Sequence, residues 1–331
     1  MTPVDTSQVL LGSSIAIQRV RALIQRVGPT DLPVLIIGPT GSGKELVAQA
    51  VHVASRRNGT LVSFNVCAIA ETMFEDALFG HVRGAFTGAL DSAPGYLREA
   101  DRGTAFFDEI GGLSLGAQAK LLRAVETRAF RPVGARGDVH SDFRLIAAAN
   151  EDIWELERAG RFRPDLAHRL SSFVIRVPAL RDHAEDIPLL ALSFLREFGC
   201  EAEANLGRET IRLLTSYDWP GNVRELRHVV RSAATLGGTG NLRSEDVREA
   251  LSWMAPRSVP LLLRTLADRR FMDVLELCEW DTEKAARHLG VHRTTIWRRM
   301  KRLCLETRQP KVGEKSQLAD DASSMSRPQS A

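Results

Sequence analysis

The stretch "PVLIIGPTGSGKE", residues 33–45, joins a short apolar run to the start of a helical pattern. Its second part matches G-x-x-x-x-G-K, a loop whose glycines let backbone N–H groups surround phosphates at the positive end of a helix. Lys44 would reach the outer phosphates, while Glu45 stands where a Ser or Thr usually supplies a magnesium ligand. The predicted nucleotide-binding residues here are Gly38, Pro39, Thr40, Gly41, Ser42, Gly43, Lys44 and Glu45.

A pair of carboxylates further along argues against a glycine turn without a ligand. Asp108 and Glu109 end the apolar run "GTAFFDE", residues 103–109. Such a pair suits ATP hydrolysis, in which one carboxylate organises Mg²⁺ and the other polarises the attacking water. Asn150 ends the run "FRLIAAAN", where its amide would either sense the γ-phosphate or make a turn. We therefore predict an ATP site with Asp108 as the ligand of Mg²⁺.

Apolar runs alternate with amphipathic stretches up to residue 178, which predicts an α/β fold with a parallel sheet covered by helices on both faces. Ligands of such sheets bind beyond the carboxyl ends of the strands. The predicted strands lie at 33–38, 60–66, 103–109, 143–150 and 173–178.

Beyond residue 178 only helical patterns follow. The predicted parts are a short N-terminal segment (1–10), an α/β nucleotide-binding subdomain (11–178), a helical lid (179–238), a glycine-containing linker (239–260), a small all-α domain (261–305) and a disordered tail (306–331).

The composition is that of an ordinary globular protein, with 44% apolar and 26% charged residues among 331. No run approaches the roughly 20 apolar residues of a membrane helix, and the first residues lack a secretory signal. The four cysteines show no paired spacing, so we expect reduced thiols in a cytoplasmic protein without membrane contact.

The basic residues concentrate near the C-terminus, where residues 257–302 contain eleven Lys and Arg against six Asp and Glu. "DTEKAARHLGVHRTTIWRRMKRL", residues 281–303, has the spacing of a helix-turn-helix, with Thr282 as a predicted cap and a second helix from about Arg293. Basic groups along that helix suit insertion into a DNA major groove, although a basic surface helix without a ligand is the alternative. The predicted DNA-binding residues are His292, Arg293, Thr294, Thr295, Arg298 and Arg299.

One aromatic side chain lies in an unusual setting, because Phe86 falls within the glycine-rich stretch "GHVRGAFTGALDSAPG", residues 80–95. Flanking glycines give the backbone freedom, and an aromatic ring offers a large contact area at small entropic cost. Phe86 is thus either presented to a partner or folded back onto its own domain.

With these residues in hand, the chain resembles the AAA+ domain of bacterial enhancer-binding proteins, the ATPase activators of sigma-54 RNA polymerase. The most specific match is the hexapeptide "GAFTGA": Gly84, Ala85, Phe86, Thr87, Gly88 and Ala89. In that family the hexapeptide tips a loop that engages sigma-54 and moves with the nucleotide state. The resemblance thus implies that Phe86 and Thr87 contact sigma-54. The C-terminal module resembles the Fis-type domain of the same activators.

Further residues are carried over from the same resemblance. It implies that Asn65 relays the nucleotide state by hydrogen bonding to Glu109, and that Arg224 reaches the phosphates in cis. Arg163 and Arg169 match arginine fingers that act on a neighbouring subunit of a hexamer, with an ion pair as the alternative role of Arg169. The chain departs from the family pattern at Cys67, Ala149 and Pro164.

The predicted function is therefore an ATP-hydrolysing transcriptional activator that binds enhancer DNA and remodels sigma-54 RNA polymerase to the open complex. The alternatives are an ATP-regulated DNA-binding regulator acting without sigma-54 and an AAA+ remodeller unrelated to transcription; the intact hexapeptide and the helix-turn-helix argue against them.

Residues 65–89 resemble the receiver-less HrpS-like subgroup, which controls type III secretion genes. The ten residues before the ATPase domain are too few for a receiver. We therefore expect control through expression level, a separate regulatory protein, or assembly of a homomeric or mixed hexamer.

Overall fold

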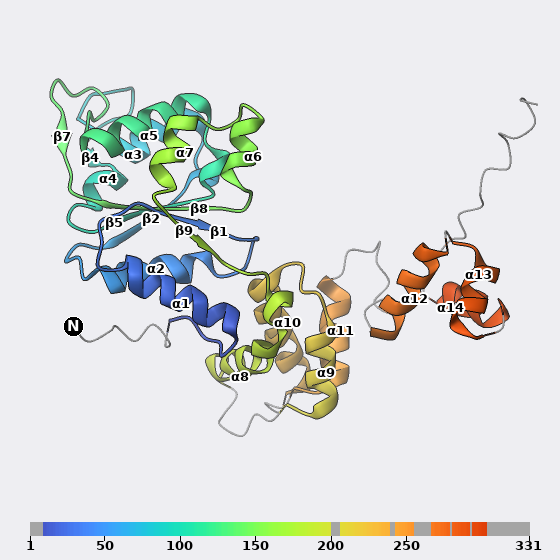
Figure 1. The fold of residues 1–331 in the computed structure, drawn as a ribbon. Coiled ribbons are helices and arrows are strands. Elements are labelled where there is room, and N and C mark those ends of the chain that lie inside the picture. Colours follow the sequence, from blue (N-terminus) through green and yellow to red (C-terminus); the bar gives the residue numbers. More distant parts are fainter. Residues whose placement is uncertain are drawn as a thin grey trace, which may run out of the picture. The chain divides into compact units, whose positions relative to one another are not determined.

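The computed structural model describes residues 9–199, 206–238, 242–254, 266–278, 280–291 and 293–302. They belong to two units, one ending at Met254 and the other beginning at Ala255. The first holds a sheet with its helices and a helical lid, and the second holds three helices (Figure 1). Within the described ranges, no helix is long and apolar enough to cross a membrane.

The central sheet has five parallel strands in the order β2-β5-β8-β1-β9. The bounds are Val34–Ile37 for β1, Leu61–Asn65 for β2, Thr104–Asp108 for β5, Arg144–Ala149 for β8 and Phe173–Arg176 for β9. Each falls within a predicted strand, so the predicted parallel α/β sheet is confirmed. The carboxyl ends of β1, β5 and β8 lead directly into the phosphate loop, Asp108 and Asn150.

Helices cover both faces of the sheet (Figure 1). On one side, α1 and α2 pack on Val34 and Ile36; on the other, the remaining helices of the subdomain pack on Leu35 and Ile37. Because successive strand residues point to opposite faces, a fully apolar β1 supplies both cores. The helices are α1 (Ile15–Val27), α2 (Lys44–Ser55), α3 (Phe74–Phe79), α4 (Tyr96–Glu99), α5 (Leu115–Thr127), α6 (Ile153–Arg158) and α7 (Pro164–Leu170).

Short elements complete this subdomain. Two antiparallel pairs, β3 with β4 and β6 with β7, lie outside the central sheet. Their bounds are Gly80–His81, Ala93–Pro94, Ala129–Phe130 and Val139–His140, and the 3-10 turns are η1 (Val66–Ala68), η2 (Glu71–Met73) and η3 (Ile110–Gly112).

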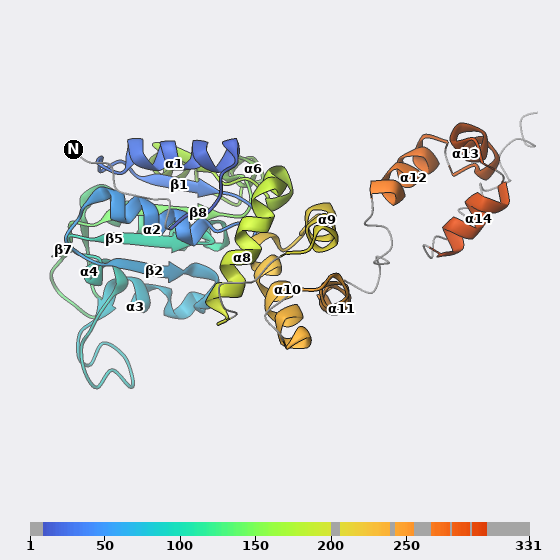
Figure 2. The same ribbon diagram turned by 90° about the horizontal axis from the view of Figure 1, so that it is seen from below.

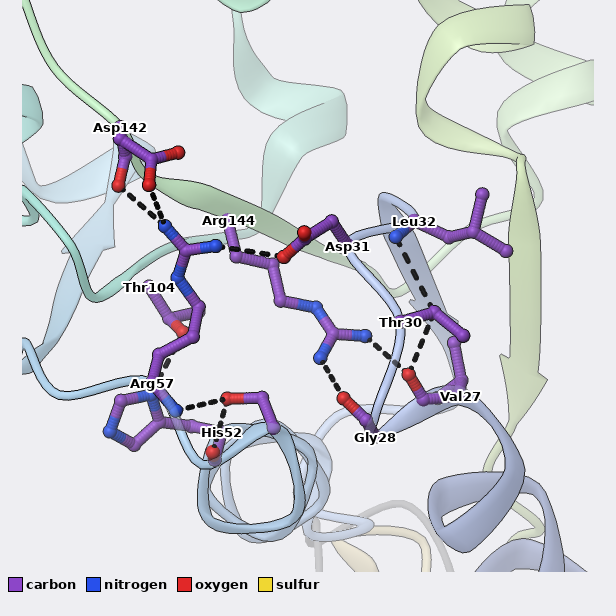
Figure 3. A network of polar contacts seen from close by, with 11 residues as sticks. Val27, Gly28, Thr30, Asp31, Leu32, His52, Arg57, Thr104, Asp142 and Arg144 are labelled. Carbon is purple, nitrogen blue, oxygen red and sulfur yellow. Dashed lines mark hydrogen bonds and ion pairs between the residues drawn. The ribbon is translucent and has the colours of Figure 1, made fainter.

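A polar network fixes the amino end of the sheet (Figure 3). Arg144, the first residue of β8, is completely buried and donates hydrogen bonds to the carbonyl oxygens of Gly28 at 2.6 Å and Val27 at 2.8 Å. Burial lowers the pKa of the Arg144 guanidinium to about 10. Arg57 lies beside it and pairs with Asp31 and Asp142, both at 2.8 Å. These bonds tie β8 to the end of α1 and the loop after it.

The lid contains η4 (Leu180–Asp186), α8 (Ile187–Glu197), α9 (Arg208–Ser216), α10 (Asn222–Gly237) and α11 (Ser244–Met254). The last helix corrects the prediction, which placed residues 239–260 in a linker. Val247, Ala250 and Leu251 recur at helical spacing and are buried, and α11 packs on α10. The glycines before Ser244 therefore separate two lid helices rather than two domains.

The described residues of the second unit form α12 (Leu266–Leu277), α13 (Thr282–Leu289) and α14 (Arg293–Arg302). Its core joins Phe271 and Leu275 of α12, Ala285 and Ala286 of α13, and Ile296 and Met300 of α14. The helix cap differs from the prediction: Asp281, not Thr282, accepts hydrogen bonds from the N–H groups of Glu283 and Lys284. Its carboxylate also carries the negative charge that a helix N-terminus favours. The predicted tail lies outside the described residues.

Candidate functional site

The phosphate loop runs from the end of β1 to the first turn of α2. Gly43, which precedes α2 at φ 95°, has no side chain with which to cap that helix, so its first N–H groups are available to an anion. The loop also requires a glycine at Gly41, because a Cβ there would lie 2.3 Å from the carbonyl oxygen of Gly221. The hydroxyl of Ser42 is buried and has no hydrogen-bond partner among the described residues.

Lys44 lies at the centre of the site. Its Nζ donates to the carbonyl oxygen of Gly38 at 2.9 Å and to Oδ1 of Asn150 at 2.5 Å. Burial lowers the pKa of the Lys44 ammonium, and the nearby Arg224 acts in the same direction, while the carboxylates of Asp108 and Glu109 oppose both. The loop therefore keeps its cation close to two acids.

Asn150 bridges Lys44 and Glu109. While its Oδ1 accepts from Lys44, its Nδ2 donates to Oε1 of Glu109 at 3.3 Å. The amide thus connects the phosphate-facing cation to the predicted catalytic carboxylate. Asn150 was predicted as a sensor of the γ-phosphate or a turn residue; the structure shows its contacts with Lys44 and Glu109, and the sensor role stays a prediction.

Glu109 follows β5 in a left-handed conformation with φ 58°, and its N–H donates to Oδ1 of Asp108 at 3.0 Å. This unusual backbone separates the directions of two consecutive carboxylates. It is a form of local strain often found at reactive sites. Oxygen donors of this kind match the ligands that Mg²⁺ prefers, so Asp108 fits the predicted metal role.

Asn65 does not make the predicted bond to Glu109. Its Oδ1 instead accepts from the N–H of Cys67 at 2.9 Å, because β2 turns directly into the 3-10 turn η1, which Asn65 caps. Among the described residues, the amide that donates to Glu109 is that of Asn150. Cys67 reaches the same carboxylate: burial raises the pKa of its thiol, and a hydrogen bond to Glu109 adds to the effect. A pocket of about 270 Å³ is lined by Cys67, Glu109 and Asn150.

The lid meets the phosphate loop at the start of α10. Asn222 is buried, donates from Nδ2 to the carbonyl oxygen of Thr40 at 2.9 Å, and accepts from the N–H of Leu180 at 2.9 Å. The N–H of Arg224 donates to the carbonyl oxygen of Gly41 at 3.2 Å. Arg224 thus lies beside the loop, and its reach to the phosphates stays a prediction. Asn222 was missed; its signal was its position two residues before Arg224, in a motif already assigned to the lid.

Of the two predicted arginine fingers, Arg163 immediately precedes α7 and Arg169 lies in its last turn. Arg163 pairs with Asp165 at 2.7 Å, so the ion-pair alternative considered for Arg169 describes Arg163 instead. Arg169 is exposed near the end of the helix. Across the described ranges, no hydrogen bond or ion pair joins either arginine to Lys44, Asp108 or Glu109. Their placement is compatible with action outside their own nucleotide site.

The hexapeptide, residues 84–89, lies in the loop between β3 and β4, which follows α3 (Figure 2). Phe86 and Thr87 are exposed, whereas Ala89 is buried. Gly84 and Gly88 have φ of 81° and 104°, a conformation that side chains rarely adopt. The structure therefore separates the predicted partner-binding residues from the nucleotide-binding ones while keeping both on one subdomain.

In the C-terminal unit, Arg293 and Thr295 are exposed on α14, and Arg293 pairs with Glu283 at 3.2 Å. Thr294, Arg298 and Arg299 lie on the same helix, but the positions of their side chains are not described. His292 lies outside the described residues. Ile296 and Met300 face the core of the unit, so their side of α14 packs against α12 and α13.

Comparison with known families divides the chain in the same way. Residues 10–176 match the sigma-54 interaction domain, and residues 181–260 match the AAA+ ATPase lid domain, which includes α11. Residues 269–303 match the Fis family of bacterial regulatory proteins.

Named relatives span most of the chain. It is 40% identical over 309 residues to the transcriptional regulatory protein ZraR of Salmonella typhimurium, covering 88% of this chain and 68% of ZraR. It is 47% identical over 236 residues to the anaerobic nitric oxide reductase transcription regulator NorR of Aeromonas salmonicida, covering 69% of this chain and 45% of NorR.

A crystal structure of NtrX from Brucella abortus in complex with ATP superposes with a TM-score of 0.68 at 29% identity, covering 89% of this chain and 70% of that one. The phosphate loop, the Asn150 bridge between Lys44 and Glu109, and the hexapeptide loop thus occur together with matches to all three domains. The chain belongs to the sigma-54-dependent transcriptional activators, as an AAA+ ATPase with a DNA-binding helix-turn-helix domain.

Proposed function

We propose that this chain hydrolyses ATP at the edge of its sheet to move residues 84–89 against sigma-54, and so opens promoter DNA bound by the polymerase. The observation that carries this proposal is the hexapeptide loop, which holds Phe86 and Thr87 exposed on the subdomain that contains Lys44 and Glu109. A loop and a reaction centre within one packed subdomain can influence each other through the packing between them.

The chemistry assigns a separate task to each group. The N–H groups at the start of α2 and the Lys44 ammonium bind the phosphates. Mg²⁺, when bound to Asp108, neutralises phosphate charge; the residue at position 45 is Glu rather than the usual hydroxyl. Glu109 accepts a proton from the attacking water, and Asn150 keeps its carboxylate oriented. Arg224, beside the loop, adds positive charge in cis.

Completion of the site requires a second subunit in this proposal. Arg163 and Arg169 act on the nucleotide of a neighbour within a hexamer; in support, no bond joins either side chain to Lys44, Asp108 or Glu109 within the part of the chain that the structure describes. An arginine supplied in this way stabilises the charge that develops during phosphoryl transfer, with an effect on rate of about a thousandfold. When the hexamer assembles, Arg163 would leave Asp165 and contact a phosphate of the neighbour's ATP.

The C-terminal unit places the ATPase near its promoter. Residues exposed on α14, among them Arg293 and Thr295, would contact enhancer DNA in the cytoplasm. The likeness of residues 65–89 to the HrpS-like subgroup supports control of type III secretion genes through a separate regulatory protein. Transcription from such a promoter, with this chain added, tests that assignment.

The substitution Thr87→Ala tests the proposed function directly. Thr87 is exposed on the hexapeptide, and among the described residues no hydrogen bond joins its side chain to the nucleotide site, so ATP hydrolysis and DNA binding should stay within about twofold of wild type. Transcription from a sigma-54 promoter should fall to background. The matched control is Ser92→Ala, which removes an exposed hydroxyl from the same loop outside the hexapeptide. Normal activation by Thr87→Ala would remove the loop from the mechanism.

A further inference from the structure

The loop that carries the hexapeptide has a fixed stem. Gly80 pairs with Pro94 and His81 with Ala93 in a short antiparallel ladder. The stem is also joined to the segment after β6, since the N–H of Val133 donates to the carbonyl oxygen of Gly80 at 2.8 Å. In return, the N–H of Val82 donates to the carbonyl oxygen of Val133 at 3.1 Å. The base of the loop is therefore held on both sides.

The tip of the loop closes on itself. The N–H of Gly84 donates to the carbonyl oxygen of Ala89 at 2.9 Å. The N–H of Ala89 donates to the carbonyl oxygen of Phe86 at 3.1 Å. A Cβ added to Gly84 or Gly88 would meet no atom within 4 Å. There is thus open space on the side of each glycine where a side chain would lie, and the backbone of residues 84–89 forms a compact turn.

Phe86 is covered more than its position at the tip would suggest. It is 44% exposed, whereas Leu90 on the same loop is 78% exposed. His81 is in contact with it: the ring centroid of His81 lies 5.0 Å from that of Phe86 at an interplanar angle of 64°. This is the edge-to-face geometry that aromatic pairs favour. The predicted partner-binding ring is therefore docked on the stem of its own loop.

His81 is itself held by the domain. Its Nδ1 lies 2.5 Å from Oδ1 of Asp76 in α3, and both side chains are largely buried. Packed rings lead from α3 to the reaction centre: Phe74 contacts Phe64, and Phe64 contacts Phe107, the residue before Asp108. A shift of β5 or α3 would therefore move the His81 ring, on which Phe86 is docked.

We propose that His81 is a positioning residue for Phe86: anchored by Asp76, its ring holds Phe86 against the stem, and firm capture of sigma-54 requires that contact to open. This inference rests on the proposed function, in which Phe86 contacts sigma-54. Because only the released ring binds, the apparent affinity is reduced by the fraction of molecules in which it is docked. Loss of an aromatic contact of this kind should lower the ratio of docked to released molecules about two- to tenfold, and the apparent affinity should rise by up to the same factor.

The test is sigma-54 binding to the full chain in two nucleotide states, with ADP alone and with ADP and aluminium fluoride. His81→Ala should bind sigma-54 about two- to tenfold more tightly than wild type with ADP, and equally with aluminium fluoride. The ATPase rate should be unchanged. His81→Phe, which keeps a ring at this position, should behave as wild type.

The ratio of the two affinities separates positioning from simple structural support, since a damaged loop would lose binding in both states. Asp76→Ala provides a second variant that keeps the His81 ring but removes its anchor; it should shift the ratio in the same direction. An unchanged ratio in either folded variant would overturn the role of His81. Phe86→Ala tests the proposed function separately, because it should abolish capture in both states even if His81 has no role.

Discussion

At the amino end of the central sheet, Arg144 gives two hydrogen bonds to the backbone carbonyl oxygens of Val27 and Gly28. At the carboxyl end, Lys44 and Glu109 are joined through the side-chain amide of Asn150. Carbonyl oxygens cannot rotate away or change protonation, whereas an amide side chain can exchange one partner for another. Both ends of the sheet therefore contain a buried cation, Arg144 or Lys44. Of these two, a bound ligand can change the partners of Lys44, which are side chains as well as carbonyl oxygens.

Glu109→Gln, at the carboxyl end of the sheet, should have the largest effect. The amide keeps the size and much of the hydrogen bonding of the carboxylate but cannot accept a proton. The maximal rate of ATP hydrolysis should fall by about 10²- to 10⁴-fold, while ATP binding and the melting temperature stay close to wild type. Phosphate release and ATP titration measure these quantities. Near-normal turnover would assign the base to another residue.

Arg144→Met makes a comparable change at the fixed end. It removes a buried cation of similar length and leaves the carbonyl oxygens of Val27 and Gly28 without these donors, so the free energy of unfolding should fall by about 3 kcal/mol. Chemical denaturation measures the loss, and ATP affinity of the folded fraction should be unchanged.

The control for Arg144 is Arg57→Ala, which removes ion pairs whose partners are mostly exposed and should cost about 1 kcal/mol or less. Equal losses in the two variants would show that burial of Arg144 has no special weight.

The strands of the sheet and its nucleotide-binding edge could be predicted from the sequence, because local sequence patterns determine them. The apolar run before Gly38 and the carboxylates after "GTAFF" fixed the strands and the edge that binds nucleotide. Arg144 was not identified, because its partners are carbonyl groups more than a hundred residues away. No local pattern marks a carbonyl oxygen as unsatisfied.

The choice between Asn65 and Asn150 also depended on geometry that the sequence does not contain. Both amides follow strands that end at the same edge, since β2 and β5 are neighbours and β5 pairs with β8. Only the turn into η1 directs Asn65 toward the N–H of Cys67. In the same way, α11 was assigned to a linker because the nearby glycines outweighed the apolar spacing of Val247, Ala250 and Leu251.

Asn150→Ala should have the smallest effect of the three principal substitutions. It removes one hydrogen bond to Lys44 and one to Glu109, each worth about 1 kcal/mol, so the maximal rate of ATP hydrolysis should fall by up to about thirtyfold. Asn65→Ala is the matched comparison, because its side chain caps η1 and does not reach Glu109. A greater loss of rate in Asn65→Ala would restore the relay that the sequence suggested.

The most direct measurement of the central claim is capture of sigma-54 by the wild-type chain held with ADP and aluminium fluoride, compared with ADP alone. The account predicts firm capture in the first state and weak capture in the second. The reason is that phosphoryl transfer at the nucleotide beside Glu109 must change the position of Phe86. Folded, nucleotide-bound and assembled protein that captures sigma-54 equally in both states, or in neither, would contradict it.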